Sequence, residues 1–254
     1  MSGIRSTSLA LLLVLSLQTL FWWSVRNRLP DMTVVPDVPG RQALQVMSFG
    51  DEEFLFRAMA MSLTNAGDTF GRFTALYKYD LHKIYLWFTL LDQFNSRSNV
   101  LPSMAAYYFS QTQKTSDVRY MVDYLYEHAK PNIQQKWWWM AQGVYLAMHK
   151  LKDTELALKL ASTLTEAKDV PLWVNQLPAF VYEKRGEFDA ALGIMENILQ
   201  HTQDIEPGEL RYMKYFIDER ISKLDALDTD ERQRLDDAKL PDQDTSPPPS
   251  DSTP

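Results

Sequence analysis

The chain has 254 residues, enough for one sizeable domain with additional segments, and its formal net charge is −7. It contains no cysteine, which excludes disulfides, thiol catalysis and cysteine-ligated zinc. Nine acidic and three basic residues fall in 225–254, so this tail carries −6 of the net charge and the rest is nearly neutral. A nearly neutral body has no basic field for nucleic acid, and we exclude that class of partner.

Residues 1–28 predict an N-terminal transmembrane anchor. The stretch 6–25 is mostly apolar and has 20 residues, roughly the length that crosses a hydrocarbon core of about 30 Å. Trp22 and Trp23 stand where an interfacial aromatic anchor belongs. A cleaved signal peptide and a buried core helix are the alternatives. The exit from the apolar run, Trp-Trp-Ser-Val-Arg, lacks the small-residue pattern of a cleavage site.

The orientation of this anchor follows from its flanking charges. Arg5 precedes the apolar run, whereas Arg26 and Arg28 follow it. The numbers of positive charges on the two sides are therefore nearly equal, and the positive-inside rule favours neither orientation clearly. A very short N-terminal tail before an anchor usually leaves the body outside the cytoplasm. We therefore expect a single-pass membrane protein whose body lies on the periplasmic, non-cytoplasmic side.

A proline-rich segment at 29–47 follows the anchor. Pro30, Pro36 and Pro39 stop a helix and favour an extended chain. We expect 29–47 to be a stalk that holds the body away from the membrane.

Residues 48–224 predict a helical body. Asp51, Glu52 and Glu53 place negative charge at a first helical turn, and Glu53 can pair with Arg57. Apolar residues then follow a helical period up to a stop at 65–67. No segment alternates with period two over any length, so we expect no strand. Further helices are expected at 80–94, 101–112 and 117–130, in two hairpins over 137–204, and at about 208–224.

The segment 137–204 consists of two similar pieces, 137–170 and 171–204. Five identical pairs stand 34 residues apart: Trp139 and Trp173, Gln142 and Gln176, Lys150 and Lys184, Ala157 and Ala191, Leu158 and Leu192. Each piece has two helical runs joined by a polar break, at 150–153 and at 183–187. A fixed period of this length is typical of stacked helical hairpins.

The second piece resembles the tetratricopeptide repeat (TPR). It has that family's small residue, aromatic, turn glycine, second aromatic and packing alanine in Ala179, Tyr182, Gly186, Phe188 and Ala191. The first piece keeps Ala157 and lacks the glycine. The resemblance implies an all-α fold, a right-handed α-solenoid of stacked antiparallel helix pairs, preceded here by one transmembrane helix.

In the family, one face of each first helix lines an inner groove. Carried over to this chain, the resemblance implies a protein-binding groove lined by Trp139, Gln142, Leu146, His149, Trp173, Gln176, Phe180 and Glu183. The Lys/Asn arrangement that clamps a C-terminal carboxylate in some members is absent. The aromatic and amide lining suits an apolar or extended protein or peptide segment. The alternative is that these residues pack between repeats.

The three consecutive tryptophans Trp137, Trp138 and Trp139 cover most of a helix circumference, because successive residues point about 100° apart. Packing on two sides can bury two of them, and the third must face the groove, the membrane or solvent. The segment 65–72 superficially resembles a phosphate loop. It lacks the Gly-Lys-Ser/Thr ending and a preceding strand, so we expect a helix end and a structured turn, with no nucleotide.

The sequence has no pattern typical of catalysis or of metal binding. The four histidines are widely spaced and no nucleophile motif is found, so we expect no enzyme activity, no catalytic or metal site and no cofactor. The tail, 225–254, is acidic and rich in Pro and Ser and is expected to be disordered.

Together these features predict a membrane-tethered scaffold for protein–protein interaction in a bacterial-type cell-envelope complex. The alternative function is a non-catalytic accessory subunit of a membrane enzyme system, such as one that handles polysaccharide or glycan.

Overall fold

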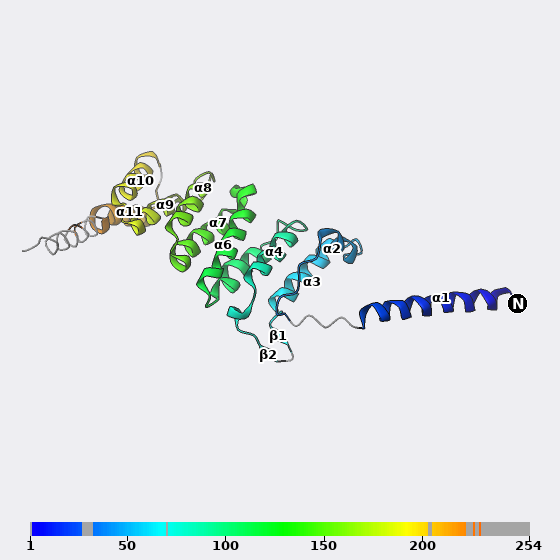
Figure 1. Ribbon diagram of the computed structural model, residues 1–254. Coiled ribbons are helices and arrows are strands. Elements are labelled where there is room, and N and C mark those ends of the chain that lie inside the picture. Colours follow the sequence, from blue (N-terminus) through cyan, green and yellow to red (C-terminus); the bar gives the residue numbers. More distant parts are fainter. Residues whose placement is uncertain are drawn as a thin grey trace, which may run out of the picture.

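The computed structural model describes residues 2–26, 33–69, 71–202 and 205–221, together with 226 and 229. Over these residues the fold is helical, as the sequence predicts, and one pair of two-residue strands is the exception (Figure 1). The α-helices are α1 (Ser2–Val25), α2 (Arg41–Met47), α3 (Glu52–Thr64), α4 (Leu81–Asp92), α5 (Val100–Ser103), α6 (Val118–Ala129), α7 (Ile133–Leu146), α8 (Thr154–Leu164), α9 (Leu172–Arg185), α10 (Phe188–His201) and α11 (Pro207–Tyr215). Short 3₁₀ and π turns extend several of these helices, including η2 (Met104–Tyr108), η3 (Phe109–Gln111), η6 (Ala147–Leu151) and η7 (Phe216–Ile221).

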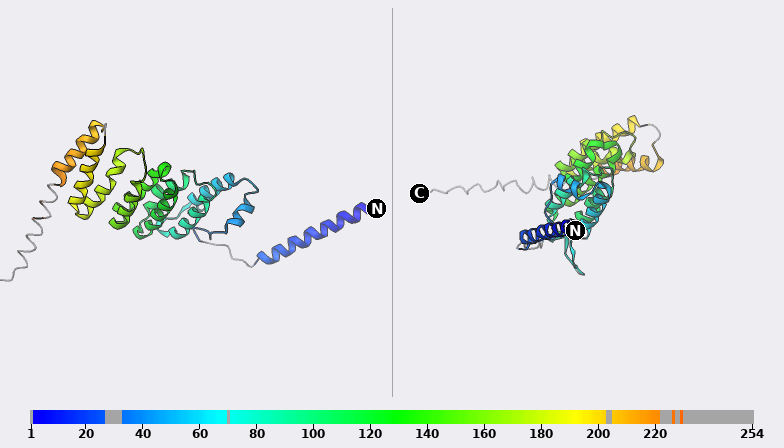
Figure 2. Two further views of the ribbon diagram at one scale, coloured as in Figure 1. Left: turned by 90° about the horizontal axis from the view of Figure 1, so that it is seen from above. Right: turned by 90° about the vertical axis from the view of Figure 1, so that its right-hand side faces the viewer.

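The helices of the body follow one another in a row, as two perpendicular views show (Figures 1 and 2). The closest packing joins neighbours in the sequence: α6 with α7, α7 with α8, α8 with α9, and α9 with α10. A large core runs from Val35 and α2 to α9, and a smaller one lies between α9, α10, α11 and η7. Within the large core the Phe88 ring packs edge-on against Phe109 and Tyr124, with centroids 5.7 and 5.1 Å apart.

Helix α1 is the one helix among the described residues that is long and apolar enough to cross a membrane, by its length and composition. Its apolar window, Ser8–Val25, is exposed throughout. The Thr19 hydroxyl donates a hydrogen bond to the Leu15 carbonyl, and the Ser16 hydroxyl donates one to the Leu12 carbonyl at 2.8 Å. These polar side chains are therefore satisfied inside the helix.

The start of the body confirms the local helix signals. The Asp51 carboxylate caps α3 by accepting a hydrogen bond from the Phe54 amide at 2.9 Å. Glu53 pairs with Arg57 one turn later at 2.7 Å, and this hydrogen bond is the main cause that lowers the pKa of Glu53. The helix ends at Asn65, where the apolar period stops.

The two polar breaks of the repeated segment also lie where the 34-residue period puts them. Lys152 ends η6 with a left-handed backbone, φ 56°, and Gly186 ends α9 in the same way, φ 77°. The first piece makes this turn without glycine, and the Asp153 carboxylate caps α8 through the Leu156 amide at 2.9 Å. One turn further on, Ala157 and Ala191 are both fully buried, which confirms their expected positions in the packing.

Replacing Ala191 by leucine should overpack the smaller core and lower the free energy of unfolding by about 1–3 kcal/mol. Ala191 is fully buried in a cluster with Ala179, Met195, Met213 and Phe216, so the added atoms displace packed side chains. Urea denaturation measures the change, and Gln200→Leu on the exposed side of the same helix is the matched control. Equal stability of the two variants would contradict the packing described here.

The predicted stalk at 29–47 is wrong for residues 33–47, which pack on the body. Val35 and Leu44 are buried in the large core, and the Trp87 indole donates a hydrogen bond to the Pro36 carbonyl at 2.9 Å. Lys83 reaches Asp37 at 2.5 Å. The prolines do keep 33–40 free of helix, but α2 forms directly after Gly40. Residues 29–32 lie outside the described part of the chain.

The segment 65–73 is a helix end followed by a tight hairpin, and the expectation that no strand exists is wrong for this one turn. Strands β1 (Asp68–Thr69) and β2 (Arg72–Phe73) pair antiparallel, with Asp68 opposite Phe73. A Cβ atom at Gly67 would collide with the hydroxyl and ring of Tyr79, so this close approach requires glycine. The tail expected at 225–254 lies outside the described residues, apart from 226 and 229.

Candidate functional site

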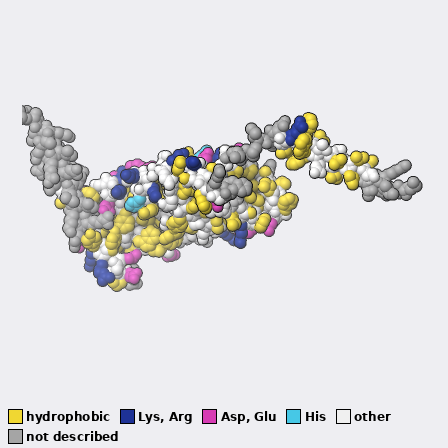
Figure 3. Space-filling model, turned by 90° about the horizontal axis from the view of Figure 1, so that it is seen from below, with side chains coloured by type: hydrophobic (Ala, Val, Ile, Leu, Met, Phe, Trp, Pro, Cys, Tyr) yellow, Lys and Arg dark blue, Asp and Glu magenta, His cyan; other side chains and the backbone are white. Residues whose placement is uncertain are grey.

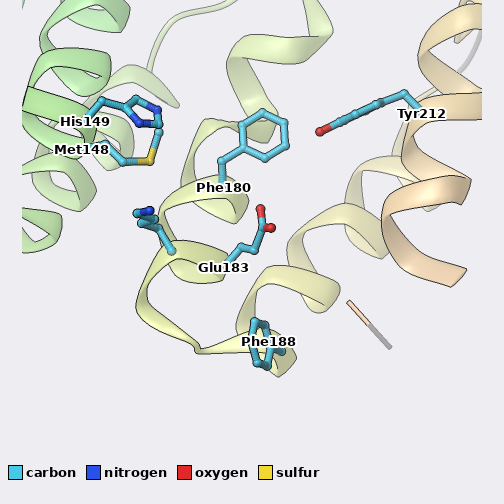
Figure 4. Close-up of a pocket in the computed structure, with 7 residues that line it drawn as sticks. Met148, His149, Phe180, Glu183, Phe188 and Tyr212 are labelled. Carbon is cyan, nitrogen blue, oxygen red and sulfur yellow. The ribbon is translucent and has the colours of Figure 1, made fainter. Parts of the chain in front are cut away.

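A pocket of about 460 Å³ is lined by η6, which continues α7, and by α9, α10 and α11, and we call it the α7–α9–α11 pocket (Figure 4). Phe180 stands in its middle, between Met148 and His149 on one side and Tyr212 on the other. Glu183 and Phe188 stand below Phe180 in this view. Among the described residues, the lining is Met148, His149, Phe180, Glu183, Lys184, Phe188 and Tyr212.

Successive elements contribute these side chains in a regular order. Met148 and His149 come from η6, which continues α7, and Phe180, Glu183 and Lys184 come from the second half of α9. Tyr212 comes from α11. His149 and Glu183 are 34 residues apart, and Phe180 and Tyr212 are 32 apart. Phe188 comes from α10, so the lining draws on η6, α9, α10 and α11.

The walls of the pocket are mainly aromatic. Phe180 is half-buried, and its ring packs against Tyr212 and Phe216 with centroids 6.1 and 5.8 Å apart. His149 packs against Tyr145, with ring centroids at 4.7 Å. Glu183 and Lys184 add one acidic and one basic group to the lining. An apolar cavity with a few polar groups at its edge is typical of a binding site for an organic ligand or a peptide side chain.

Three of the eight groove residues taken from the resemblance line this pocket, namely His149, Phe180 and Glu183. The prediction is wrong for three others. Trp139, Leu146 and Gln176 are buried and cannot line an open groove. The remaining two, Gln142 and Trp173, are half-buried and lie outside the pocket lining.

The physical reason is that α7 and α9 each pack against helices on both sides. The Trp139 indole donates a hydrogen bond to the Asn99 side chain at 3.0 Å, toward the preceding hairpin. Gln176 is 2% exposed, and its amide nitrogen finds no hydrogen-bond partner among the described residues. A first helix so enclosed leaves only its C-terminal half open to the pocket.

A second feature is an aromatic cluster formed by Tyr107, Trp137, Trp138, Trp139 and Trp173. Trp137, Trp138 and Trp173 pack edge to face, with centroids 5.8–6.1 Å apart. The Trp138 indole donates to the Tyr107 hydroxyl at 3.0 Å. Trp139 is buried, Trp137 half-buried and Trp138 42% exposed, so one of the three consecutive tryptophans faces outward as expected.

A third feature is a buried polar network that the sequence analysis missed. The His128 imidazole lies 2.8 Å from the Asp92 carboxylate, which also accepts a hydrogen bond from the Tyr124 hydroxyl at 3.2 Å. Burial, together with the Asp92 charge, raises the pKa of Tyr124 well above its ordinary value. Lys136 donates to the His128 carbonyl at 3.1 Å, and partial burial lowers the pKa of its ammonium group.

This network joins α4 to α6 and adjoins two pockets of about 200 and 560 Å³. One signal was present in the sequence, because Tyr124 and His128 are four residues apart and share the buried face of α6. Their partner Asp92 lies 36 residues before His128, beyond the reach of any helical pattern. All three side chains are satisfied by one another, which is how a core keeps buried polar groups.

No group of three or more His, Asp or Glu side chains in the part of the chain that the structure describes could hold a metal ion. Comparisons of the chain with protein-family models, with curated proteins and with solved structures return no match.

Proposed function

We propose that the protein is a TPR-like helical-repeat scaffold that binds an extended apolar segment of a partner protein in the α7–α9–α11 pocket. The observation that carries this proposal is the periodic origin of the lining. His149 in η6, which continues α7, and Glu183 in α9 are 34 residues apart, and Phe180 in α9 and Tyr212 in α11 are 32 apart, close to the same period. A solenoid repeats its surface in this way, so that one groove crosses several repeats.

The chemistry of the pocket indicates the kind of segment. Phe180, Tyr212 and Phe188 provide aromatic surface for an apolar side chain. Glu183 and Lys184 provide groups that can hydrogen-bond the polar backbone on either side of it. In this proposal the chain supplies a docking surface and carries out no reaction itself.

The proposed scaffold is held at a membrane by α1. Support comes from its apolar, exposed window of 18 residues and from the tryptophans at its end. Arg26 lies over the Trp23 ring at 3.8 Å, an arrangement suited to the water–lipid boundary. In this proposal the body lies on the non-cytoplasmic side, within an assembly of the cell envelope.

A matched pair of tyrosines on the last helix tests the groove. Tyr212 lines the pocket, whereas Tyr215 is exposed on the same helix outside the lining. We expect Tyr212→Ala to reduce recovery of the partner from detergent-solubilised membranes by about 10-fold or more, as for an interface hot spot. Tyr215→Ala should retain the partner, and both variants should melt near the wild-type temperature. Equal retention by the two variants would contradict the groove.

A further inference from the structure

The first two helices of the body present an apolar surface to solvent, which we call the α2–α3 apolar surface. Its members are large and strongly exposed: Val46 (74%), Met47, Phe49 (97%), Phe54 (69%) and Met61 (69%). Large apolar side chains that are exposed together in this way mark contact with another apolar phase or molecule.

Helix α3 is apolar on two opposite sides. Phe54 and Met61 are seven residues apart, about two turns, so they project from one face of the helix. Leu55, Phe56, Ala60 and Leu63 are buried against the body on the other side. A surface helix that needed only the body for its stability would carry polar residues at positions 54 and 61.

The turn between α2 and α3 exposes Phe49 in a strained backbone conformation. Phe49 adopts a left-handed backbone, φ 49°, which a bulky side chain disfavours, and Gly50 follows with φ 91°. Ser48 fixes this turn, since its hydroxyl donates to the Gln45 carbonyl at 2.8 Å and accepts from the Gly50 amide at 3.2 Å. The strain persists at the side chain that is most exposed, which indicates a functional role.

The position of this surface in the chain identifies what covers it. Helix α1 ends at Val25, and the described body begins again at Thr33. Eight steps of an extended chain reach at most about 28 Å, so the start of the body stays close to the membrane surface. Val35 and Leu44 then dock this segment on the core, directly before the exposed side chains begin at Val46. The space-filling view shows apolar side chains, in yellow, at the end of the body that lies nearer to α1 (Figure 3).

We propose that the α2–α3 apolar surface lies in the interfacial layer of the bilayer that α1 spans, and that lipid covers it. The proposal rests on the membrane tether and is independent of the groove. The acidic residues Asp51, Glu52 and Glu53 directly precede Phe54, and Arg57 is paired with Glu53, so the described residues of this surface offer no unpaired basic group to an anionic headgroup. Its contact with lipid is therefore made by the apolar side chains. Binding therefore requires no anionic lipid and is insensitive to salt.

The absence of native cysteine allows single-cysteine spin labels in the full chain. Phe49→Cys and Phe54→Cys report the surface, Leu15→Cys reports α1, and Glu196→Cys on the exposed side of α10 reports solvent. The labelled chains are placed in phosphatidylcholine nanodiscs, and relaxation by oxygen is compared with relaxation by a water-soluble nickel complex. We expect the oxygen-to-nickel ratio at 49 and 54 to exceed that at 196 by about three-fold or more, unchanged by salt, as for a buried apolar face.

A solvent-like ratio at 49 and 54, with a bilayer-like ratio at 15, would overturn the proposal and leave the tether intact. A solvent-like ratio at 15 as well would overturn both. Dipolar broadening between labels at 49 that disappears in nanodiscs holding one copy, together with exposure to nickel there, would show that a second copy covers the surface. That result also overturns the proposal.

Discussion

Replacing Phe109 by alanine should lower the free energy of unfolding by about 3–5 kcal/mol. Phe109 is fully buried and lies at the centre of the large core, with ring centroids 5.7 Å from Phe88 and 5.9 Å from Tyr79. Truncation removes the ring contacts with Phe88 and Tyr79, and the helices around the site limit how far the cavity can collapse. Urea denaturation followed by circular dichroism measures the change.

The matched control is Phe73→Ala. Phe73 is almost fully exposed on the β1–β2 hairpin, so its truncation should change stability by less than about 0.5 kcal/mol. A loss of stability below about 1 kcal/mol for Phe109→Ala would show that the packing of η3 against α4 described here is wrong, since the Phe109 and Phe88 rings meet there.

Replacing Phe180 by alanine should weaken capture of the partner by about 2 kcal/mol, or about 30-fold in affinity. Its cost in stability should stay well below the 3–5 kcal/mol of a core phenylalanine, because the ring is half-buried and faces the pocket. Titration of the partner and thermal melting of the same preparation separate the two effects. If the variant unfolds while its folded fraction binds with unchanged affinity, Phe180 belongs to the core and the groove assignment fails.

Local features of the fold could be predicted from the sequence because each depends on residues within one or two turns. The Asp51 cap, the Glu53–Arg57 pair and the helix stop at Asn65 are of this kind. The buried pair Ala157 and Ala191 could be predicted because the 34-residue period is itself visible in the sequence.

Features that depend on distant partners could not be predicted. Pro36 accepts a hydrogen bond from Trp87, 51 residues later, and no pattern within 29–47 indicates this docking. The Asp92–His128 pair spans 36 residues in the same way. Of the eight predicted groove residues, Gln176 shows the cause of error most clearly. The resemblance assigns a face to each first helix, but enclosure of α9 from both sides buries the N-terminal part of that face.

The measurement that tests the groove most directly is photo-crosslinking in the native membrane. A benzophenone amino acid replaces Glu183, which lines the pocket, or Glu196, which is exposed on α10 outside it. If the pocket of α7, α9 and α11 holds a partner segment, the label at 183 gives one discrete crosslinked product, which Tyr212→Ala abolishes, and the label at 196 gives none. Identical products from both positions, or a product at 183 that survives Tyr212→Ala, would contradict the proposal that this pocket binds the partner.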